Sequence, residues 1–344
     1  MNNFLVFTLV FFSSIEIFSQ TNSSENNFVL SSRWFHPIDN NDTISTEKAI
    51  KEFKPKRIDW IYTTDKKELK VYSDLNIPYS LALNPQIPDS LGYTTKSTRI
   101  LKSNNQNYIA PWMVNDKIKN PYWGCVNNPM FVQTFYKRSK FLISLKPYAL
   151  FLDDPEFNIR LKKENLVGCF CDYCVDGFLA KNKDFAPQKA KIKKKVTKYS
   201  KNKKNKKGDL ILRYEKFQAM SVTNFLVDWK KEMLTINKDL KFLVNNYNGN
   251  WDDFLQVFDG GIAEINSSLL VDSTLNKIFA KAKRMNKTQL LTTNSSNKED
   301  QYFLMKYCLK NNIELLIPWD LYLKDSKKRF FIDYSVFKNI VNGY

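Results

Sequence analysis

Eight short apolar runs alternate with amphipathic stretches along this 344-residue chain, and this alternation constrains the fold more than any other feature. Most of the runs are rich in β-branched and aromatic residues and end in Asp, Asn, Ser or Pro. Continuous apolar strands are typical of a parallel sheet that is covered on both faces. The runs are FVLSSRWFHP (28–37), RIDWIYTTD (57–65), IPYSLALNP (77–85), YALFLDDPE (148–156), LKFLVNNYNGN (240–250), GGIAEIN (260–266), TQLLTTNSS (288–296) and IELLIPWDLYL (313–323).

The stretches between the runs have the apolar periodicity of helices. Pro129 suits the first turn of one of them. Strands alternating with helices in this way predict an α/β fold, a (β/α)8 barrel with long insertions after strands three and four. A doubly wound open sheet is the alternative, although no glycine-rich dinucleotide motif follows the first run. The expected helices cover residues 45–53, 128–145, 213–234, 273–285, 298–311 and 333–344.

The first twenty residues, MNNFLVFTLVFFSSIEIFSQ, have the apolar centre of a secretory signal peptide, although a basic start is missing. The alternative is a retained hydrophobic anchor, but the apolar run is too short to span a bilayer. We therefore expect residues 1–20 to be a signal peptide, residues 27–344 to be one barrel domain, and the protein to be secreted or periplasmic. No other segment is apolar enough to cross a membrane.

The formal charge of +18 is concentrated in one segment. Residues 181–207 contain 13 lysines and one aspartate, which predicts a mobile, lysine-rich insertion. Such a run could bind a polyanion such as an anionic polysaccharide, or it could reflect a compositional bias without function. Export from the cell argues against nucleic acid as the partner.

Carboxyl groups lie at the ends of several predicted strands, among them Asp153 and Asp154 on the fourth strand and Glu264 on the sixth. In a (β/α)8 barrel the chemistry lies at the carboxyl ends of the strands. Cleavage of a glycosidic bond needs two carboxyl groups, one protonated and one ionised. We therefore predict that Asp153, Asp154 and Glu264 are catalytic. The alternatives are a helix cap or brace for the aspartates and an ion pair for Glu264.

Amide and aromatic side chains accompany these carboxyl groups at the predicted strand ends. Aromatic rings pack on the apolar faces of sugars, and amides hydrogen-bond their hydroxyl groups, so a carbohydrate substrate is expected. Structural roles, such as barrel core for Trp319, are the alternative. The predicted substrate-binding residues are Trp34, His36, Asn245, Tyr247, Trp251, Trp319 and Asp320.

Several enzyme classes are disfavoured by what the sequence lacks. The chain contains one histidine, no G-x-S-x-G motif and no phosphate-binding G-x-x-x-x-G-K-[ST] motif. These absences argue against a serine or cysteine hydrolase and against a phosphate-binding loop of the P-loop type.

Four of the five cysteines form a set around the fourth predicted strand: Cys125 precedes it, and Cys169, Cys171 and Cys174 follow it. Four thiolates from two loops match a closed, structural zinc site. One disulfide with two free thiols, or four inert thiols, are the alternatives. Cys308 lies on a predicted amphipathic helix and is expected to be a small buried residue.

The cysteine pattern resembles the zinc site of glycoside hydrolase family 42 β-galactosidases, over Cys125 to Cys174. The wider pattern of LDDP, CFCDYC and PWDLYL is similar to uncharacterised secreted bacterial proteins classed as glycosidases. The resemblance implies a barrel fold, structural zinc and a carbohydrate substrate. That family has an Asn-Glu pair ending strand four and a glutamate ending strand seven. This chain has Asp153-Asp154-Pro155 and LLTTNSS at those places.

The sequence therefore predicts a secreted glycoside hydrolase with an aspartate on strand four and Glu264 on strand six. Two alternatives stay open: a catalytically degenerate carbohydrate-binding barrel, and a protein that binds an anionic polysaccharide through residues 181–207.

Overall fold

The computed structural model describes residues 27–31, 46–86, 98–111, 114, 122–164, 166–201, 208–293, 295 and 297–318. The predicted signal peptide and the predicted helix at residues 333–344 lie outside these ranges. So do four of the predicted substrate-binding residues, namely Trp34, His36, Trp319 and Asp320.

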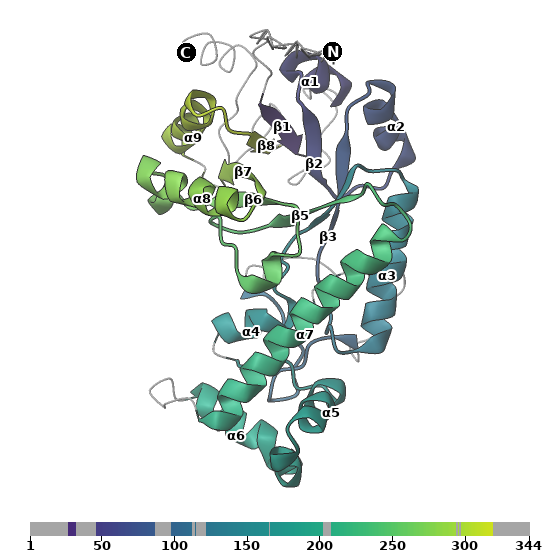
Figure 1. Ribbon diagram of the computed structural model, residues 1–344, viewed down its shortest axis with the longest axis vertical. Helices are drawn as coiled ribbons and strands as arrows, with labels where there is room; N and C mark the ends of the chain where they lie inside the picture. Colours follow the sequence, from purple (N-terminus) through teal and green to yellow (C-terminus); the bar gives the residue numbers. More distant parts are fainter. Residues whose placement is uncertain are drawn as a thin grey trace, which may run out of the picture.

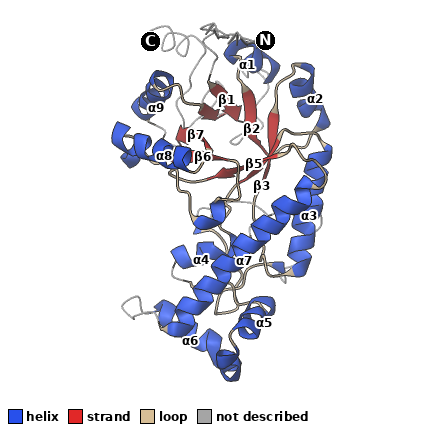
Figure 2. Cartoon of the chain, in the orientation of Figure 1, coloured by secondary structure: helices blue, strands red, loops and turns tan. Residues whose placement is uncertain are grey.

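The strands form a closed, all-parallel barrel in chain order, which confirms the predicted (β/α)8 fold. Each strand lies within one of the eight apolar runs, and Figure 2 shows the strands in the middle of the surrounding helices. The strands are β1 (Phe28–Ser31), β2 (Arg57–Ile61), β3 (Tyr79–Leu83), β4 (Ala149–Leu152), β5 (Lys241–Asn245), β6 (Gly260–Ile265), β7 (Thr288–Thr293) and β8 (Leu315–Pro318).

Helices follow the strands and cover the outside of the barrel (Figure 1). Asn128 caps α3 by accepting hydrogen bonds from the backbone amides of Met130 and Phe131, and Pro129 occupies the first turn as predicted. The sequence did not predict α2, which Asp65 caps. The helices of the ring are α1 (Thr46–Phe53), α2 (Lys66–Asp74), α3 (Pro129–Ser144), α7 (Asp209–Leu234), α8 (Asp272–Arg284) and α9 (Lys298–Lys310).

The barrel has an apolar interior and a larger apolar layer between strands and helices. Trp60 enters the interior at a positive φ of 63°, where the pairing of β2 with β3 shifts in register. Its ring centre lies 4.5 Å from that of Phe151. The interior residues are Val29, Trp60, Ala82, Ala149, Phe151, Leu243, Ile262, Leu290 and Leu316.

The loops after β3 and β4 build a second apolar core, which we call the inserted core. Short antiparallel bridges, such as Leu101 with Asn107, fold the first loop back on itself. The second loop supplies α4 (Arg160–Lys163), α5 (Asp172–Lys181) and α6 (Lys189–Lys201). In Figure 1 these helices lie below the barrel, and α7 runs from them to the strands. Among the described helices, none combines the length and apolarity needed to cross a bilayer.

The described part of the lysine-rich segment is helical, whereas the sequence predicted a mobile insertion. Residues 189–201 form α6, and residues 183–188 form a short 3-10 helix. Ile192 and Val196 are fully buried in the inserted core. Their spacing of four residues is a helical signal, which the many lysines around them obscured.

Candidate active site and cysteine cluster

Alternate residues of the central strands point into the barrel, and this period places polar side chains above the apolar interior. Phe151, Leu243 and Ile262 belong to the interior cluster. Two residues further along the same strands, Asp153, Asn245 and Glu264 follow at the carboxyl ends. The structure thus brings together a predicted carboxylate on β4, a predicted amide on β5 and a predicted carboxylate on β6.

The carboxylate of Asp153 accepts three hydrogen bonds. Tyr62 donates its hydroxyl to Oδ2 at 2.6 Å, and Nδ2 of Asn245 donates to Oδ1 at 3.0 Å. The backbone amide of Asp154 donates to Oδ1, also at 3.0 Å. Desolvation by the surrounding protein raises the pKa of Tyr62 well above its ordinary value, and the negative charge of Asp153 adds to this effect. Tyr62 therefore stays a donor, and Asp153 is held as an acceptor in a fixed orientation.

Asn245 also joins Asp153 to the second carboxyl group. Its Nδ2 lies 3.3 Å from Oε2 of Glu264, whose side chain is 5% exposed. Because the two carboxyl oxygens lie 3.0 Å and 3.3 Å from one nitrogen, they are at most about 6.3 Å apart, which is close enough for a catalytic carboxyl pair. Asn245 itself is fixed because its Oδ1 accepts the backbone amide of Tyr247 at 3.1 Å.

Asp154 lies next to this pair in a backbone conformation that few residues other than glycine adopt. Its φ is 49°, and such conformations gather at functional sites. Burial raises the pKa of its carboxyl group well above the ordinary value, and the negative charges of Asp153, Glu156 and Glu264 add to this effect. Arg160 opposes the shift but does not cancel it. Asp154 therefore keeps its proton to a higher pH than an ordinary aspartate does.

Glu156 is occupied by ion pairs. It contacts Nη1 of Arg160 at 3.2 Å and also Nζ of Lys163. A small hollow of about 20 Å³ lies between this segment and the loop after β5, and Asn245, Tyr247 and Lys163 are among its lining residues. Asn245, which donates to Asp153, is one of several polar residues that line the hollow.

Two further polar residues at the barrel mouth were not predicted from the sequence. Tyr62 follows β2. Because the register shifts at Trp60, simple alternation of inward and outward residues along β2 does not predict the direction of Tyr62. Thr292 pairs in register with Glu264, and its fully buried hydroxyl makes no hydrogen bond with any described residue. Period-two counting along β7 from Leu290 could have identified Thr292.

The other predicted substrate-binding residues that the structure describes fall in different places. Tyr247 is 47% exposed and donates its hydroxyl to Asn266 at 3.0 Å. Trp251 is only 3% exposed, packs in the layer between strands and helices, and donates its indole N–H to Gln289 at 2.9 Å. The structure therefore brings Tyr247 to the mouth but not Trp251, which is a core residue.

The four predicted cysteines converge in the inserted core. All four are buried, and their sulfur atoms lie within 4.8 Å of one another, close enough to hold a metal ion. Sγ of Cys125 lies 3.3 Å from Cys174 and 3.7 Å from Cys171. These distances exceed the roughly 2.05 Å of a disulfide, and all four thiols are free. Zinc–sulfur bonds of about 2.3 Å in a tetrahedron separate sulfurs by about 3.8 Å, which fits this set.

Amide groups point at three of the four sulfurs, namely those of Cys125, Cys169 and Cys174. The backbone amide of Leu101 points at Cys169 at 3.4 Å, and Nδ2 of Asn127 points at Cys174 at 3.2 Å. Nδ2 of Asn158 points at Cys125 at 3.4 Å. Such donors stabilise negative charge on sulfur and orient the ligands of a metal.

Asn158 connects the cysteine cluster to the candidate active site. It lies in the short 3-10 helix Phe157–Ile159, directly after the segment Asp153–Glu156. Besides contacting Cys125, its side chain donates to Gln218 on α7 at 2.8 Å and accepts the backbone amide of Val126 at 3.3 Å. The cluster therefore braces the loop that carries the β4 carboxyl groups.

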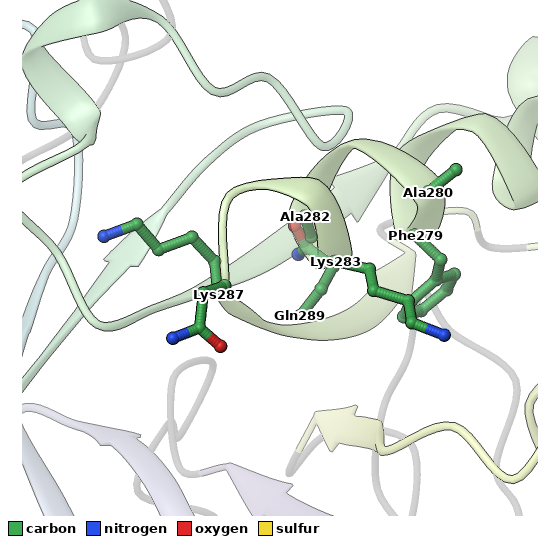
Figure 3. A pocket seen from close by; sticks show the side chains of 7 residues that line it. Phe279, Ala280, Ala282, Lys283, Lys287 and Gln289 are labelled. Atoms are coloured by element: carbon green, nitrogen blue, oxygen red, sulfur yellow. The ribbon is translucent and has the colours of Figure 1, made fainter.

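A second described cavity, of about 310 Å³, lies away from the mouth (Figure 3). It is formed by the end of α8 and the start of β7, with Phe279, Lys283 and Lys287 among its lining residues. Lys287 is engaged with the backbone carbonyls of Gln256 and Phe258. None of the predicted site residues lines this cavity.

No family model and no curated protein matches this chain. Solved structures are similar at very low sequence identity. α-L-Fucosidase isoenzyme 2 from Paenibacillus thiaminolyticus is 11% identical, with 93% of this chain and 48% of that chain covered and a TM-score of 0.53. β-Galactosidase from the psychrophilic Marinomonas ef1 is 7% identical, with 85% and 53% covered and a TM-score of 0.53.

Eubacterium rectale Amy13B is 6% identical, with 88% of this chain and 67% of that chain covered and a TM-score of 0.50. This chain spans about half the length of the fucosidase and the galactosidase. The fucosidase and the galactosidase are glycoside hydrolases, and at these identities the likeness shows that this chain shares their barrel fold.

Proposed function

We propose that this protein is a glycoside hydrolase that cleaves a poly- or oligosaccharide with two carboxyl groups at the barrel mouth. The observation that carries the proposal is the bridge from Asp153 through Asn245 to Glu264. The likeness of the fold to glycoside hydrolases supports it. A secreted or periplasmic location belongs to the proposal and rests on the composition of residues 1–20 alone.

The spacing of the two carboxyl groups suggests their roles. Retaining glycosidases hold their carboxyl groups about 5–5.5 Å apart, whereas inverting enzymes need about 6.5–9.5 Å. The oxygens of Asp153 and Glu264 that share Asn245 lie within about 6 Å, which favours retention. Asp153, surrounded by donors, is then the nucleophile, and Glu264 is the general acid.

Asp154 is the alternative proton donor because of its raised pKa. Thr292 offers a buried hydroxyl beside Glu264, suited to a substrate hydroxyl or to water. Tyr62 and Tyr247 expose ring surface on which a sugar could pack. Trp34, His36, Trp319 and Asp320 remain predictions for substrate contact.

The cysteine cluster completes the proposal as a structural zinc site with Cys125, Cys169, Cys171 and Cys174 as ligands. All four are buried, so no side of the ion would face a substrate. Its contribution would be to hold the segment that carries Asp153 and Asp154, by way of Asn158.

The test compares Glu264→Gln with Asp154→Asn on a panel of aryl glycosides. We expect Glu264→Gln to lower kcat/KM about 10²–10⁴-fold for poor leaving groups and far less for dinitrophenyl leaving groups, which need no proton. Asp153→Asn should be inactive on both, and the exposed Glu299→Gln should behave as wild type. The anomeric form of the first product, read by NMR, should be that of the substrate.

Two results would contradict this assignment. If Asp154→Asn rather than Glu264→Gln shows the dependence on the leaving group, Asp154 is the acid. If the wild-type protein binds glycans but releases no reducing sugar from any of them, the catalytically degenerate barrel is the better description. The observation that favours a catalytically degenerate barrel is that β7 ends in Thr292 and Thr293, without a carboxyl group.

A further inference from the structure

The outward face of α6 carries a row of lysines. Lys191, Lys194, Lys195 and Lys198 are exposed and follow the i, i+3, i+4, i+7 spacing of one helix face. The row extends for about 10 Å along the helix axis. The thirteen residues of α6 include no acidic residue, so the row is a continuous positive surface.

The opposite face of α6 is fixed to the inserted core. Ile192 and Val196 are fully buried there. Thr197 donates its hydroxyl to Ser103 at 2.8 Å, and Lys193 donates to Asn105 at 2.9 Å. Like charges at this spacing destabilise a helix by themselves, so tertiary packing is what holds the row together. The lysines are therefore presented on a rigid element.

Neighbouring acidic groups do not neutralise the row. Asp176 pairs with Lys189 at 2.5 Å, and Asp184 pairs with Arg213 at 3.2 Å. In the part of the chain that the structure describes, no carboxylate lies within ion-pair distance of Lys191, Lys194 or Lys198. These ammonium groups are available to an external anion.

The exposed face of α6 has the charge expected of a polyanion site. It lacks the stacking rings of a single-stranded nucleic-acid site and the apolar residues of a membrane-binding surface. Phe185 and Tyr199 pack against the inserted core, so no ring among the described residues of this face is offered for stacking on bases. The exposed positions carry no large apolar residue that could enter a bilayer. Because the inserted core grows from the loops after β3 and β4, α6 belongs to the same end of the barrel as the candidate active site (Figure 1).

We propose that the lysine face of α6 binds an anionic polysaccharide bearing sulfate or carboxylate groups. The further step, that this polymer is the substrate class of the barrel, rests on the proposed function. In that case α6 holds the polymer at a distance from the bond to be cleaved, and binding on α6 raises the local concentration of chain at the mouth.

The experiment measures binding of dextran sulfate and of uncharged dextran to the full chain at several salt concentrations. The triple variant Lys191→Glu, Lys194→Glu, Lys198→Glu should bind dextran sulfate at least about tenfold more weakly and with a shallower salt dependence. The matching arginine variant should bind as wild type does. A control with Lys238→Glu, Lys277→Glu and Lys310→Glu has the same change in net charge and should keep its affinity within about twofold.

Equal affinity of the glutamate variant and the wild type for dextran sulfate would overturn the proposal, as would an equal loss in the control. A short DNA duplex or anionic lipid vesicles bound more tightly than dextran sulfate would assign the face to a different partner. Hydrolysis of a small neutral aryl glycoside should be the same in both triple variants. If no variant hydrolyses any glycoside, the proposed function fails while the binding result on α6 still stands.

Discussion

At the scale of single residues, the adjacent carboxyl groups of Asp153 and Asp154 lie in different surroundings at the barrel mouth. Asp153 faces three hydrogen-bond donors, whereas Asp154 is half-buried and lies next to other negative charges. Neighbouring carboxyl groups in different environments are the usual arrangement for opposite roles in acid–base chemistry. The pair therefore gives the site one acceptor and one group that keeps its proton.

The raised pKa of Asp154 predicts a stability effect with a defined sign. The folded protein holds this proton more tightly than the unfolded chain, so Asp154 favours folding below the unfolded pKa of about 3.9 and disfavours it increasingly as pH rises through the folded pKa. Asp154→Asn removes this cost. Its melting temperature should exceed that of the wild type at pH 7, and the gap should shrink towards pH 4.

Thermal unfolding followed by circular dichroism at several pH values measures this gap. Asp239→Asn, on an exposed turn, provides the control and should show no such gap. A gap that widens towards acid would mean that Asp154 is ionised more easily in the folded protein than in the unfolded chain.

The strand-end argument from the sequence pointed to Asp153, Asn245 and Glu264, which the structure brings together. It did not point to Tyr62, and it placed Trp251 in the same site. The position of Tyr62 depends on the irregular backbone at Trp60, which no residue pattern predicts. Trp251 follows a strand end and was predicted to contact substrate, but the chain turns back and buries it in the outer layer. The direction of a side chain can be predicted from local sequence within a strand, but not once a loop begins.

At the scale of elements, the short 3-10 helix Phe157–Ile159 connects the candidate active site to the cysteine cluster. Asn158 is fully buried and contacts Cys125, Gln218 and the backbone of Val126. Gly168, near the cysteines, could not carry a side chain because a Cβ would lie 2.5 Å from Gln218. The elements of the inserted core are thus packed around the cluster rather than attached to its edge.

Removal of one thiol should loosen the inserted core and leave the barrel folded. We expect Cys171→Ser to lower the bound zinc from about one per chain to near zero, because a three-cysteine site lacks a closed ligand set. Limited proteolysis should then cut within residues 98–201 first. Chelation of the wild-type protein should have the same effect.

Cys308→Ser is the matched control, since Cys308 is buried on α9 away from the cluster. It should keep its metal. If the purified wild-type protein contains no metal and its thiols form a disulfide on oxidation, the zinc assignment is wrong.

The strands and most of the ring helices were predictable because their apolar patterns are set by burial alone, although α2 was missed. All eight strands coincide with the apolar runs, and α3, α7, α8 and α9 begin and end within a few residues of their expected limits. By contrast, α6 was missed because its apolar side is narrow, with Ile192 and Val196 facing a core that exists only after two distant loops meet. Nothing local in the sequence indicates that meeting.

At the scale of the whole molecule, an ionic network spans the amino end of the barrel next to its closing seam. Arg57 on β2 forms a two-pronged contact with Glu314, just before β8, and a 2.8 Å contact with Asp59. Tyr148 donates its hydroxyl to Asp59 at 2.7 Å. Because β1 lies between β2 and β8, the network ties together both neighbours of the first strand.

The network predicts acid sensitivity of the fold. Burial alone would raise the pKa of Glu314, but the hydrogen bond and charge of Arg57, together with Lys56, lower it overall. A lowered folded pKa means that Glu314 stabilises the fold above its unfolded pKa, and that this stabilisation is lost as pH falls through the folded pKa. Glu314→Gln should therefore be less stable than wild type at pH 7, and the two should converge in acid.

Chemical denaturation at a series of pH values measures the difference in the free energy of unfolding. Glu232→Gln breaks an exposed ion pair with Lys140 and should change stability by at most about 1 kcal/mol. An acid dependence that is identical in wild type and Glu314→Gln would exclude this network as its source.

The helix α7 belongs to both cores of the molecule. Its first turns bury Tyr214 and Phe217 in the inserted core, and its later turns bury Phe225 and Trp229 against the barrel. All four clustered cysteines precede α7 in the chain. The backbone carbonyl of Cys169 nevertheless accepts a hydrogen bond from the hydroxyl of Tyr214, which lies on α7. During synthesis, which proceeds from the amino end, the inserted core can close once α7 has emerged, while β5 to β8 are still unmade. The nascent chain would thus bring its four cysteines together when only β1 to β4 have been synthesised, and the barrel would close last.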